Sequence, residues 1–394
     1  MSEVRGHSTM QGGSRVVAAI LIGVVAALVV NSLPVFLTVL ARARGLNESQ
    51  SGLIAFADMG GIAIGTTFCA LSPRVVGYLT WRWVTAFGLL LLCAANILSI
   101  VVPGIPTLLV ARTLAGCGSG LAMAVTYAVL AQGDGARELA IFNVAQIGVG
   151  SLAMLLLGPI ADRYGAGGLF GVIATLALCA LVLCIAIPRG KRGSAPSAGA
   201  PHERVTRNGW LAIASVFLYF AGAGAIYGYL SFMGIAWGGT ASDVESSLSA
   251  VMFASMMGGV VVSVVGSRFG LTRPMYVGSV VLLASIVLLA TVQPVHQFVL
   301  LGGVFGFAWN IVTPYQFEAV TLIDESSSAA MLVNAATLGG LAVGPAVAGF
   351  LATPTYFRVN MLALGMCVVS LSLLGFVLRL RRIVSRPAQK GTPS

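Results

Sequence analysis

Two charged residues, Asp58 and Arg112, lie inside apolar stretches that are each long enough to cross a membrane. At about 1.5 Å of rise per helical residue, both lie 9–12 Å below the same predicted membrane boundary. A charge at that depth is costly unless it is paired or hydrated, so an ion pair is expected. The carboxylate could bind and release a proton as Arg112 withdraws and returns. Alternatively, the pair is static and braces two helices. The sequence leaves both interpretations open.

Neutral polar residues interrupt several of the same stretches, either to hydrogen-bond neighbouring helices or to line a polar cavity. Because they gather in some stretches and are nearly absent from others, a cavity is favoured. The candidates are Asn31, Tyr127, Asn143, Gln146, Tyr227, Asn310, Tyr315 and Asn334. Glu318, near the end of its stretch, either faces such a cavity or reaches water at a helix end.

The elements that position these residues follow from composition. The chain has 394 residues, 58% hydrophobic and 9% charged, whereas a soluble domain is about a quarter charged. At about 20 residues per crossing, a dozen membrane helices are predicted. We predict them at 16–40, 50–72, 83–103, 106–131, 139–161, 167–188, 209–233, 246–267, 274–293, 297–320, 328–352 and 357–378.

The only sizeable polar break, 189–208, is rich in Gly, Ser, Pro, Ala and basic residues, and is typical of a flexible linker. It divides the chain into an N-terminal bundle, 1–188, and a C-terminal bundle with a basic tail, 209–394. Each bundle holds six predicted helices.

The distribution of charge predicts the orientation of the helices. With the N-terminus inside, most of the 22 Lys and Arg residues fall in inside segments. Both termini are therefore expected in the cytoplasm of a multi-pass inner-membrane protein. The net charge of +10 reflects this bias in topology and does not indicate nucleic-acid binding.

Several functions are disfavoured by what the sequence lacks. It has no G-x-x-x-x-G-K-[ST] phosphate loop, which argues against ATP as the direct energy source. The three histidines lie outside the predicted spans, and the six cysteines form no C-x-x-C pair. No enzyme, cofactor or metal site is therefore expected.

The two halves repeat one another in short motifs. Met59-Gly60-Gly61 matches Met257-Gly258-Gly259. Gly118 and Tyr127 match Gly306 and Tyr315, and Asn143 resembles Asn334 in its surroundings. Internal duplication of this kind is typical of transporters. We predict a two-fold pseudo-symmetry axis along the membrane normal, with Gly118 over Gly306 and Asn143 over Asn334.

Two six-helix halves, a basic central linker and the sequence Arg112, Gly116, Gly118 resemble the major facilitator superfamily and its R-x-x-x-G-x-G pattern. The resemblance implies an all-α fold of twelve transmembrane helices in two pseudo-symmetric halves. In that family helices 1, 4, 7 and 10 line the central cavity, flanked by helices 2, 5, 8 and 11. Most of the polar candidates named above would then face this central cavity.

The implied function is secondary transport by alternating access, and the chain is expected to act as a monomer. The expected substrate is a small amphipathic or aromatic organic compound, and H⁺ coupled through Asp58 and Arg112 is the expected driving ion. Two pairs, Gly158-Pro159 and Gly344-Pro345, resemble the G-x-x-x-G-P motif of drug antiporters and favour efflux. One alternative is uptake of a small organic anion anchored by Arg112. The other is a receptor or structural protein that does not transport.

Overall fold

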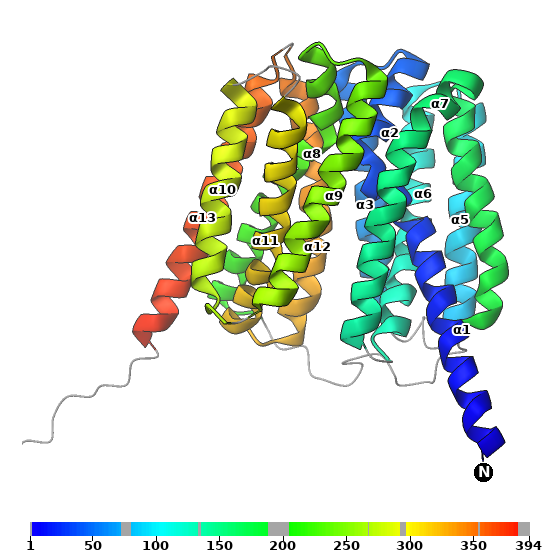
Figure 1. The fold of residues 1–394 in the computed structure, drawn as a ribbon, viewed down its shortest axis with the longest axis horizontal. Helices are drawn as coiled ribbons and strands as arrows, with labels where there is room; N and C mark the ends of the chain where they lie inside the picture. The colour runs from blue at the N-terminus through cyan, green and yellow to red at the C-terminus, as the bar shows by residue number, and fades with distance from the viewer. Residues whose placement is uncertain are drawn as a thin grey trace, which may run out of the picture.

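In a computed structural model, residues 2–71, 80–132, 135–187, 205–266, 268–291, 297–353 and 355–384 are described, and their regular structure is entirely helical (Figure 1). The helices are α1 Ser2–Ala26, α2 Leu28–Arg44, α3 Glu48–Leu71, α5 Trp81–Val101, α6 Ile105–Leu130, α7 Gly135–Leu183, the 3₁₀ turn η1 Cys184–Ala186, α8 Arg207–Ala236, α9 Ala241–Val265, α10 Thr272–Thr291, α11 Phe298–Ile323, α12 Ser327–Leu351 and α13 Phe357–Val384.

In the described part of the chain, eleven helices are long and apolar enough to cross a membrane. One crossing, Gly13–Arg44, joins α1 and α2 through the break at Ala27. The α7 helix has 49 residues, about twice what a bilayer requires. It reverses at Gly165, where φ is +62°, so its two arms are separate crossings that run in opposite directions (Figure 1). Twelve crossings result, as predicted.

The twelve crossings pack as two bundles, α1 to η1 and α8 to α13. In the first, α6 packs on α3 and α5, and in the second, α8 packs on α12 and α13. Both bundles begin at the same end of the molecule, where the described termini also lie, so the halves are parallel rather than inverted (Figure 1). This end is called the termini end below, and the opposite one the far end. Most of the predicted linker, 189–208, lies outside the described residues.

Similar glycine contacts occur in the two halves. Gly61 of α3 packs against the backbone carbonyl of Thr113 in α6, and Gly258 of α9 packs against that of Phe307 in α11. Gly65 of α3 makes the same kind of contact with the carbonyl of Cys117 one turn further along, so these contacts show which helices pair but not the register of the repeat.

The predicted superposition of Gly118 on Gly306 is wrong, because the two glycines face different neighbouring helices. Gly118 packs on α5 against Gly88, whereas Gly306 packs on α9. Small residues recur at successive turns of these helices because backbones approach closely there. A match of single glycines can therefore slip along the helix. The superposition of Asn143 on Asn334 stays a prediction.

At the termini end, Asp324 ties the loop after α11 to the start of α8. Its Oδ2 accepts hydrogen bonds from Thr206 N (2.7 Å) and Thr206 Oγ1 (2.8 Å), and its Oδ1 accepts one from Ser326 N (3.0 Å). Burial raises the pKa of this carboxyl, but the hydrogen bonds from Ser326 and Thr206 outweigh burial and lower the pKa of Asp324 to about 2. The ionised carboxylate therefore stabilises the C-terminal half.

Asp324→Asn is expected to lower the melting temperature at pH 7, because the neutral amide accepts these hydrogen bonds less strongly. The folded pKa lies below the unfolded value of about 3.9. The stabilisation is thus complete above about pH 4 and is lost as pH falls toward 2. Thermal unfolding in detergent from pH 7 to pH 3 checks this, with exposed Glu318→Gln as the control. A pH-independent difference would contradict the assignment.

Candidate functional site: a cleft between the halves

Among the described residues, hydrogen bonds and close glycine contacts between the two halves lie between mid-depth and the far end. Tyr227 Oη of α8 donates to the carbonyl oxygen of Asn31 in α2 (2.9 Å). Nearer the far end, the hydroxyls of Ser151 in α7 and Ser249 in α9 lie 2.6 Å apart. Gly52 of α3 packs against Pro345 of α12. The halves are therefore closed against one another at the far end.

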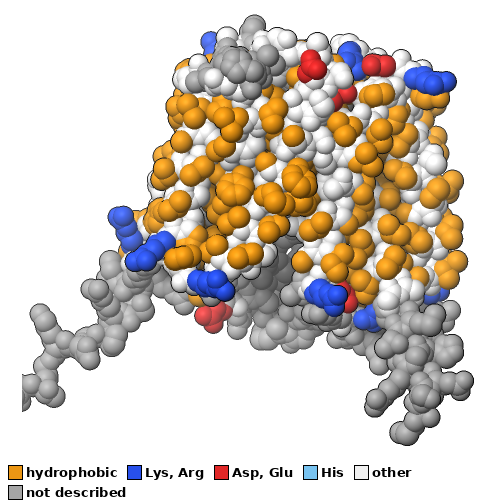
Figure 2. All heavy atoms as spheres, viewed as in Figure 1, with side chains coloured by type: hydrophobic (Ala, Val, Ile, Leu, Met, Phe, Trp, Pro, Cys, Tyr) orange, Lys and Arg blue, Asp and Glu red, His pale blue; other side chains and the backbone are white. Residues whose placement is uncertain are grey.

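At the termini end the halves separate. The surface is notched between them there, while apolar side chains cover the flanks of both bundles (Figure 2). Tyr127 is 43% exposed, and Asn143 and Asn334 are exposed as well, although all three lie in membrane-spanning helices. These three side chains are therefore not packed inside either bundle.

Amide side chains form a connected row on the N-terminal wall of the cleft. Asn31 Nδ2 lies 3.4 Å from Gln146 Oε1, and Gln146 Nε2 donates to Asn143 Oδ1 (2.7 Å). Gly150 allows α7 to approach Asn31 closely, since a side chain at this position would overlap it. The row runs from the junction with Tyr227 toward the termini end. Three predicted cavity residues are thus brought together.

Aromatic side chains form a second row, on the C-terminal half. Tyr227 meets the ring of Trp309 in α11 edge to face, with centroids 5.6 Å apart. Trp309 meets Phe220 of α8 at 6.1 Å, and Phe220 stacks on Phe317 at 5.9 Å. The aromatic row begins beside the amide row, because Tyr227 is bonded to Asn31. Trp309 was not among the predicted site residues, although its spacing of eight residues from Phe317 places both near one face of a helix.

Asp58 and Arg112 form the predicted ion pair, and this contact is confirmed. Arg112 Nη2 lies 2.6 Å from Asp58 Oδ1, and Arg112 Nε lies 2.9 Å from the same oxygen. Arg112 Nη1 also donates to Asn96 Oδ1 of α5 (2.9 Å), a partner that the sequence did not single out. The rings of Phe36 and Phe170 lie 5.4 and 5.3 Å from the guanidinium carbon.

This cluster is enclosed within one half. Its side chains come from α2, α3, α5, α6 and the second arm of α7, and none comes from the C-terminal bundle. Arg112 and Asp58 are only 1% and 2% exposed. The pair therefore does not line the cleft, and its predicted role in ion coupling stays a prediction.

The remaining predicted residues are divided between the cleft and the packing of the halves. Tyr315 does not face the cleft, which corrects the prediction: it is 3% exposed and donates to Gly266 O (3.1 Å) at the end of α9. Such a hydroxyl caps a helix within its own bundle. Asn310 Nδ2 donates to Gly306 O of its own helix (3.1 Å).

The predicted packing residues lie at backbone contacts. Gly116 lies against Asp58 and Gly61 of α3, and Gly344 lies against Ala221 of α8. Gly158 faces the carboxylate of Glu245 in α9, a residue that sequence analysis placed outside the membrane helix. Pro159, which follows it, is exposed.

No group of three His, Cys, Asp or Glu residues in the described ranges is arranged to hold a metal ion. The chemistry available between the halves is hydrogen bonding from the amide row and ring contacts from the partly buried Trp309 and Phe317, whereas Phe220 is buried in the core. Two parallel helical bundles, closed on each other at one end and parted at the other, are typical of membrane transporters built from two repeated halves.

A family model described as the Major Facilitator Superfamily matches residues 19–321. The chain belongs to this family, and it is a multi-pass membrane transporter. A comparison with curated proteins finds no match.

Solved structures share the fold. A crystal structure of a mutant of the nucleoside transporter NupG has a TM-score of 0.73 at 13% identity, covering 93% of this chain and 99% of that one. A bacterial homolog of the human lysosomal transporter Spinster, in an inward-facing and unoccupied conformation, has a TM-score of 0.70 at 13% identity, covering 98% and 99%. At this identity the likeness concerns the fold alone.

Proposed function

We propose that the protein is a proton-coupled secondary transporter that works by alternating access and moves a small, uncharged, amphipathic or aromatic organic compound. The observation that carries the proposal is the pair of rows that diverge from the contact between Tyr227 and Asn31. One row offers amide donors and acceptors, the other offers rings, and neither carries a charge. A planar solute with hydrogen-bonding edges is complementary to both walls.

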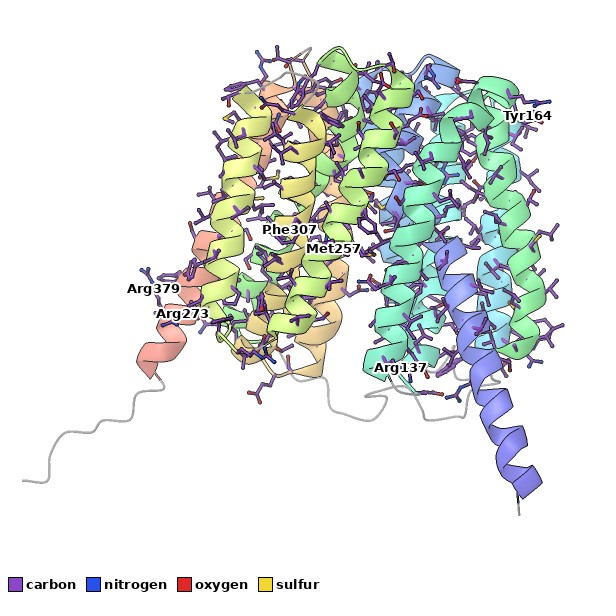
Figure 3. All side chains as sticks on the ribbon, viewed as in Figure 1. Arg137, Tyr164, Met257, Arg273, Phe307 and Arg379 are labelled. Carbon is purple, nitrogen blue, oxygen red and sulfur yellow. The ribbon has the colours of Figure 1, made fainter. Side chains whose placement is uncertain are left out.

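The orientation supports a cleft that opens to the cytoplasm. Arg137, Arg273 and Arg379 lie toward the termini end, whereas Tyr164 lies at the far end (Figure 3). Basic residues are enriched on the cytoplasmic side of inner-membrane proteins. We therefore assign the termini end to the cytoplasm and the closed far end to the outside. The conformation is then inward-facing.

Export is the proposed direction, and H⁺ the proposed coupling ion. Gly158-Pro159 and Gly344-Pro345, which resemble the antiporter motif, both lie where α7 and α12 pack closely on neighbouring helices. A metal cation takes several oxygen ligands, whereas a proton needs only one carboxylate. The buried carboxylates of the membrane helices, Asp58 and Glu245, occupy separate sites among the described residues.

The geometry argues against the alternative of organic-anion uptake. A substrate carboxylate would need Arg112, but this guanidinium is hydrogen-bonded to Asp58 and Asn96 and lies between two rings. It is 1% exposed. We therefore propose that Arg112 braces the N-terminal half. A single chain supplies both walls of the cleft, so we also propose that the monomer is the working unit.

Trp309→Ala is expected to weaken binding of neutral aromatic compounds about tenfold, because a ring contact contributes on the order of 1 kcal/mol beyond its buried area. Suitable probes are radiolabelled chloramphenicol, a neutral aromatic amide, and uridine, because the fold is shared with a nucleoside transporter. Equilibrium binding to the purified protein measures the effect. The matched control is Trp210→Ala, which removes an exposed ring at the termini end. Equal binding by wild type and Trp309→Ala would contradict the proposed aromatic wall.

A further inference from the structure

Glu245 is a carboxylate buried at the interface between the two halves. It lies in the second turn of α9, close to the far end, and is 7% exposed. Its two carboxylate oxygens occupy the space where a side chain at Gly158 of α7 would begin, so a larger residue there would displace the carboxylate from this position. No hydrogen-bond donor within the described part of the chain reaches this carboxylate. The group is therefore seated in the closed contact with weak compensation for any charge that it carries.

The charged groups that face Glu245 do little to offset its burial. Arg42 of α2 attracts the ionised carboxylate, while Asp162 of α7 repels it. Arg42 Nη2 is itself bonded to Asp162 Oδ1 at 2.8 Å, so its charge is shared. On α9, Asp243 is exposed and accepts from Thr240 Oγ1 (2.6 Å).

The other helices packed against α9 bring no compensating charge to this end. The described charged residues of α8 and α11 are Arg207 and Glu318, and both lie toward the termini end of their helices. The environment of Glu245 therefore depends mainly on whether α7 and α9 are in contact.

Closure of this contact and protonation of Glu245 are thermodynamically linked. Burying an ionised carboxylate without hydrogen bonds is much more costly than burying a neutral carboxylic acid. When the halves part at the far end, as alternating access requires, the contact with Gly158 is lost and the carboxylate meets water. The open state then favours the ionised form, and the closed state favours the protonated form.

We propose that Glu245 is a proton-binding site of the outer gate, where binding of H⁺ from outside favours the closed contact with Gly158. The inference rests on the proposed alternating access, and it deepens the proposed coupling by assigning a residue. Gly158 forms the seat of this site, and the hydroxyl contact between Ser151 and Ser249 closes the interface beside it. Lower external pH then shifts the protein toward the inward-facing state.

Distances between spin labels test the proposal without a substrate. The labels are attached at Ala43→Cys and Ser242→Cys, exposed positions at the far end, one in each half of a protein without its native cysteines. In liposomes at pH 8 to 5, the wild-type background should show a closed population that grows as pH falls. The closed-to-open ratio should change by up to tenfold per pH unit.

Glu245→Gln, which mimics the protonated form, should remain closed at every pH. Asp243→Asn removes an exposed carboxylate from the same helix and should keep the wild-type pH response. Gly158→Ala should weaken the pH response, because the added methyl group displaces the flexible carboxylate from its seat while the helices can stay in contact. A full pH response in Gly158→Ala would show that Glu245 does not titrate in this contact.

A pH response in Glu245→Gln equal to that of the wild-type background would overturn the proposal, as would the absence of any response in that background. Failure of the proposed function looks different. If neither chloramphenicol nor uridine is transported while the distances respond to pH through Glu245, the substrate proposal fails and the gate remains. If transport is coupled to H⁺ while Glu245→Gln keeps the full response, the gate proposal fails alone.

Discussion

Arg112→Ala is expected to have the largest effect on stability of any single substitution in the N-terminal half. It removes the only basic partner of Asp58 within the described structure and leaves a carboxylate that is 2% exposed among apolar side chains. Breaking a buried ion pair from one side costs about 3–5 kcal/mol, a large share of a typical folding free energy of about 5–15 kcal/mol. Thermal unfolding of the purified protein should show a markedly lower midpoint and a lower yield.

A matched pair of variants separates lost charge from lost packing. Asp58→Asn combined with Arg112→Gln leaves no unpaired charge, so it should be more stable than Arg112→Ala alone. If the double variant is no better, the loss comes from packing between Phe36 and Phe170 rather than from the buried carboxylate.

Asp58→Asn also distinguishes the brace from the coupling role that the sequence suggested. A brace predicts that substrate exchange and gradient-driven accumulation fall together as the amount of folded protein falls. Coupling at Asp58 predicts that accumulation vanishes while exchange survives, because exchange needs only the alternation of the halves. If exchange survives while accumulation is lost, the proton-coupling role belongs to Asp58.

Gly116→Ala is expected to have the second largest effect, because α3 and α6 meet there backbone to backbone. A Cβ at position 116 would overlap the carbonyl oxygen of Asp58 and lie 2.9 Å from the Cα of Gly61. Overpacking costs about 1–3 kcal/mol where side chains can adjust, and here backbone atoms would have to move. The shift would also displace Asp58 from Arg112. A lower unfolding midpoint and a smaller folded fraction are the expected readouts.

Gly60→Ala provides the control on α3, next to Gly61. A Cβ at this position meets no atom within 4 Å. Alanine is favoured over glycine in a helix interior by about 1 kcal/mol, so this variant should match or slightly exceed the wild type in stability. Similar losses from both substitutions would show that glycine at position 116 is needed for a reason other than close helix packing.

The membrane helices were predictable because each is a long apolar segment flanked by polar residues, a signal contained in the local sequence. The contact between Asp58 and Arg112 followed from their equal depth, since two opposite charges at one level in an apolar bundle are expected to pair. Glycine matches indicated the repeat but not its register, because close contacts recur every turn. Gly118 thus packs on α5, while Gly306 packs on α9.

Other features depend on how the helices are rotated and docked, which no local pattern specifies. The hydrogen bond from Arg112 to Asn96 forms because α5 and α6 pack side by side, which the local sequence does not specify. Glu245 lies one residue before the predicted helix 246–267 and was not predicted to be a site residue. Only the docking of α9 on Gly158 buries it. Tyr315 is a polar residue within a membrane helix, as a cavity residue would be. The rotation of α11 nevertheless directs its hydroxyl to the carbonyl oxygen of Gly266.

Transport in proteoliposomes tests the central claim most directly. Purified protein is reconstituted, a pH gradient is imposed, and the movement of radiolabelled chloramphenicol, uridine and benzoate is followed with and without a protonophore. We predict that at least one of the two neutral compounds accumulates against its gradient, that the protonophore abolishes this accumulation, and that Trp309→Ala reduces it while Trp210→Ala does not. Accumulation of benzoate alone, or movement of the neutral compounds that is indifferent to the pH gradient, would contradict the account.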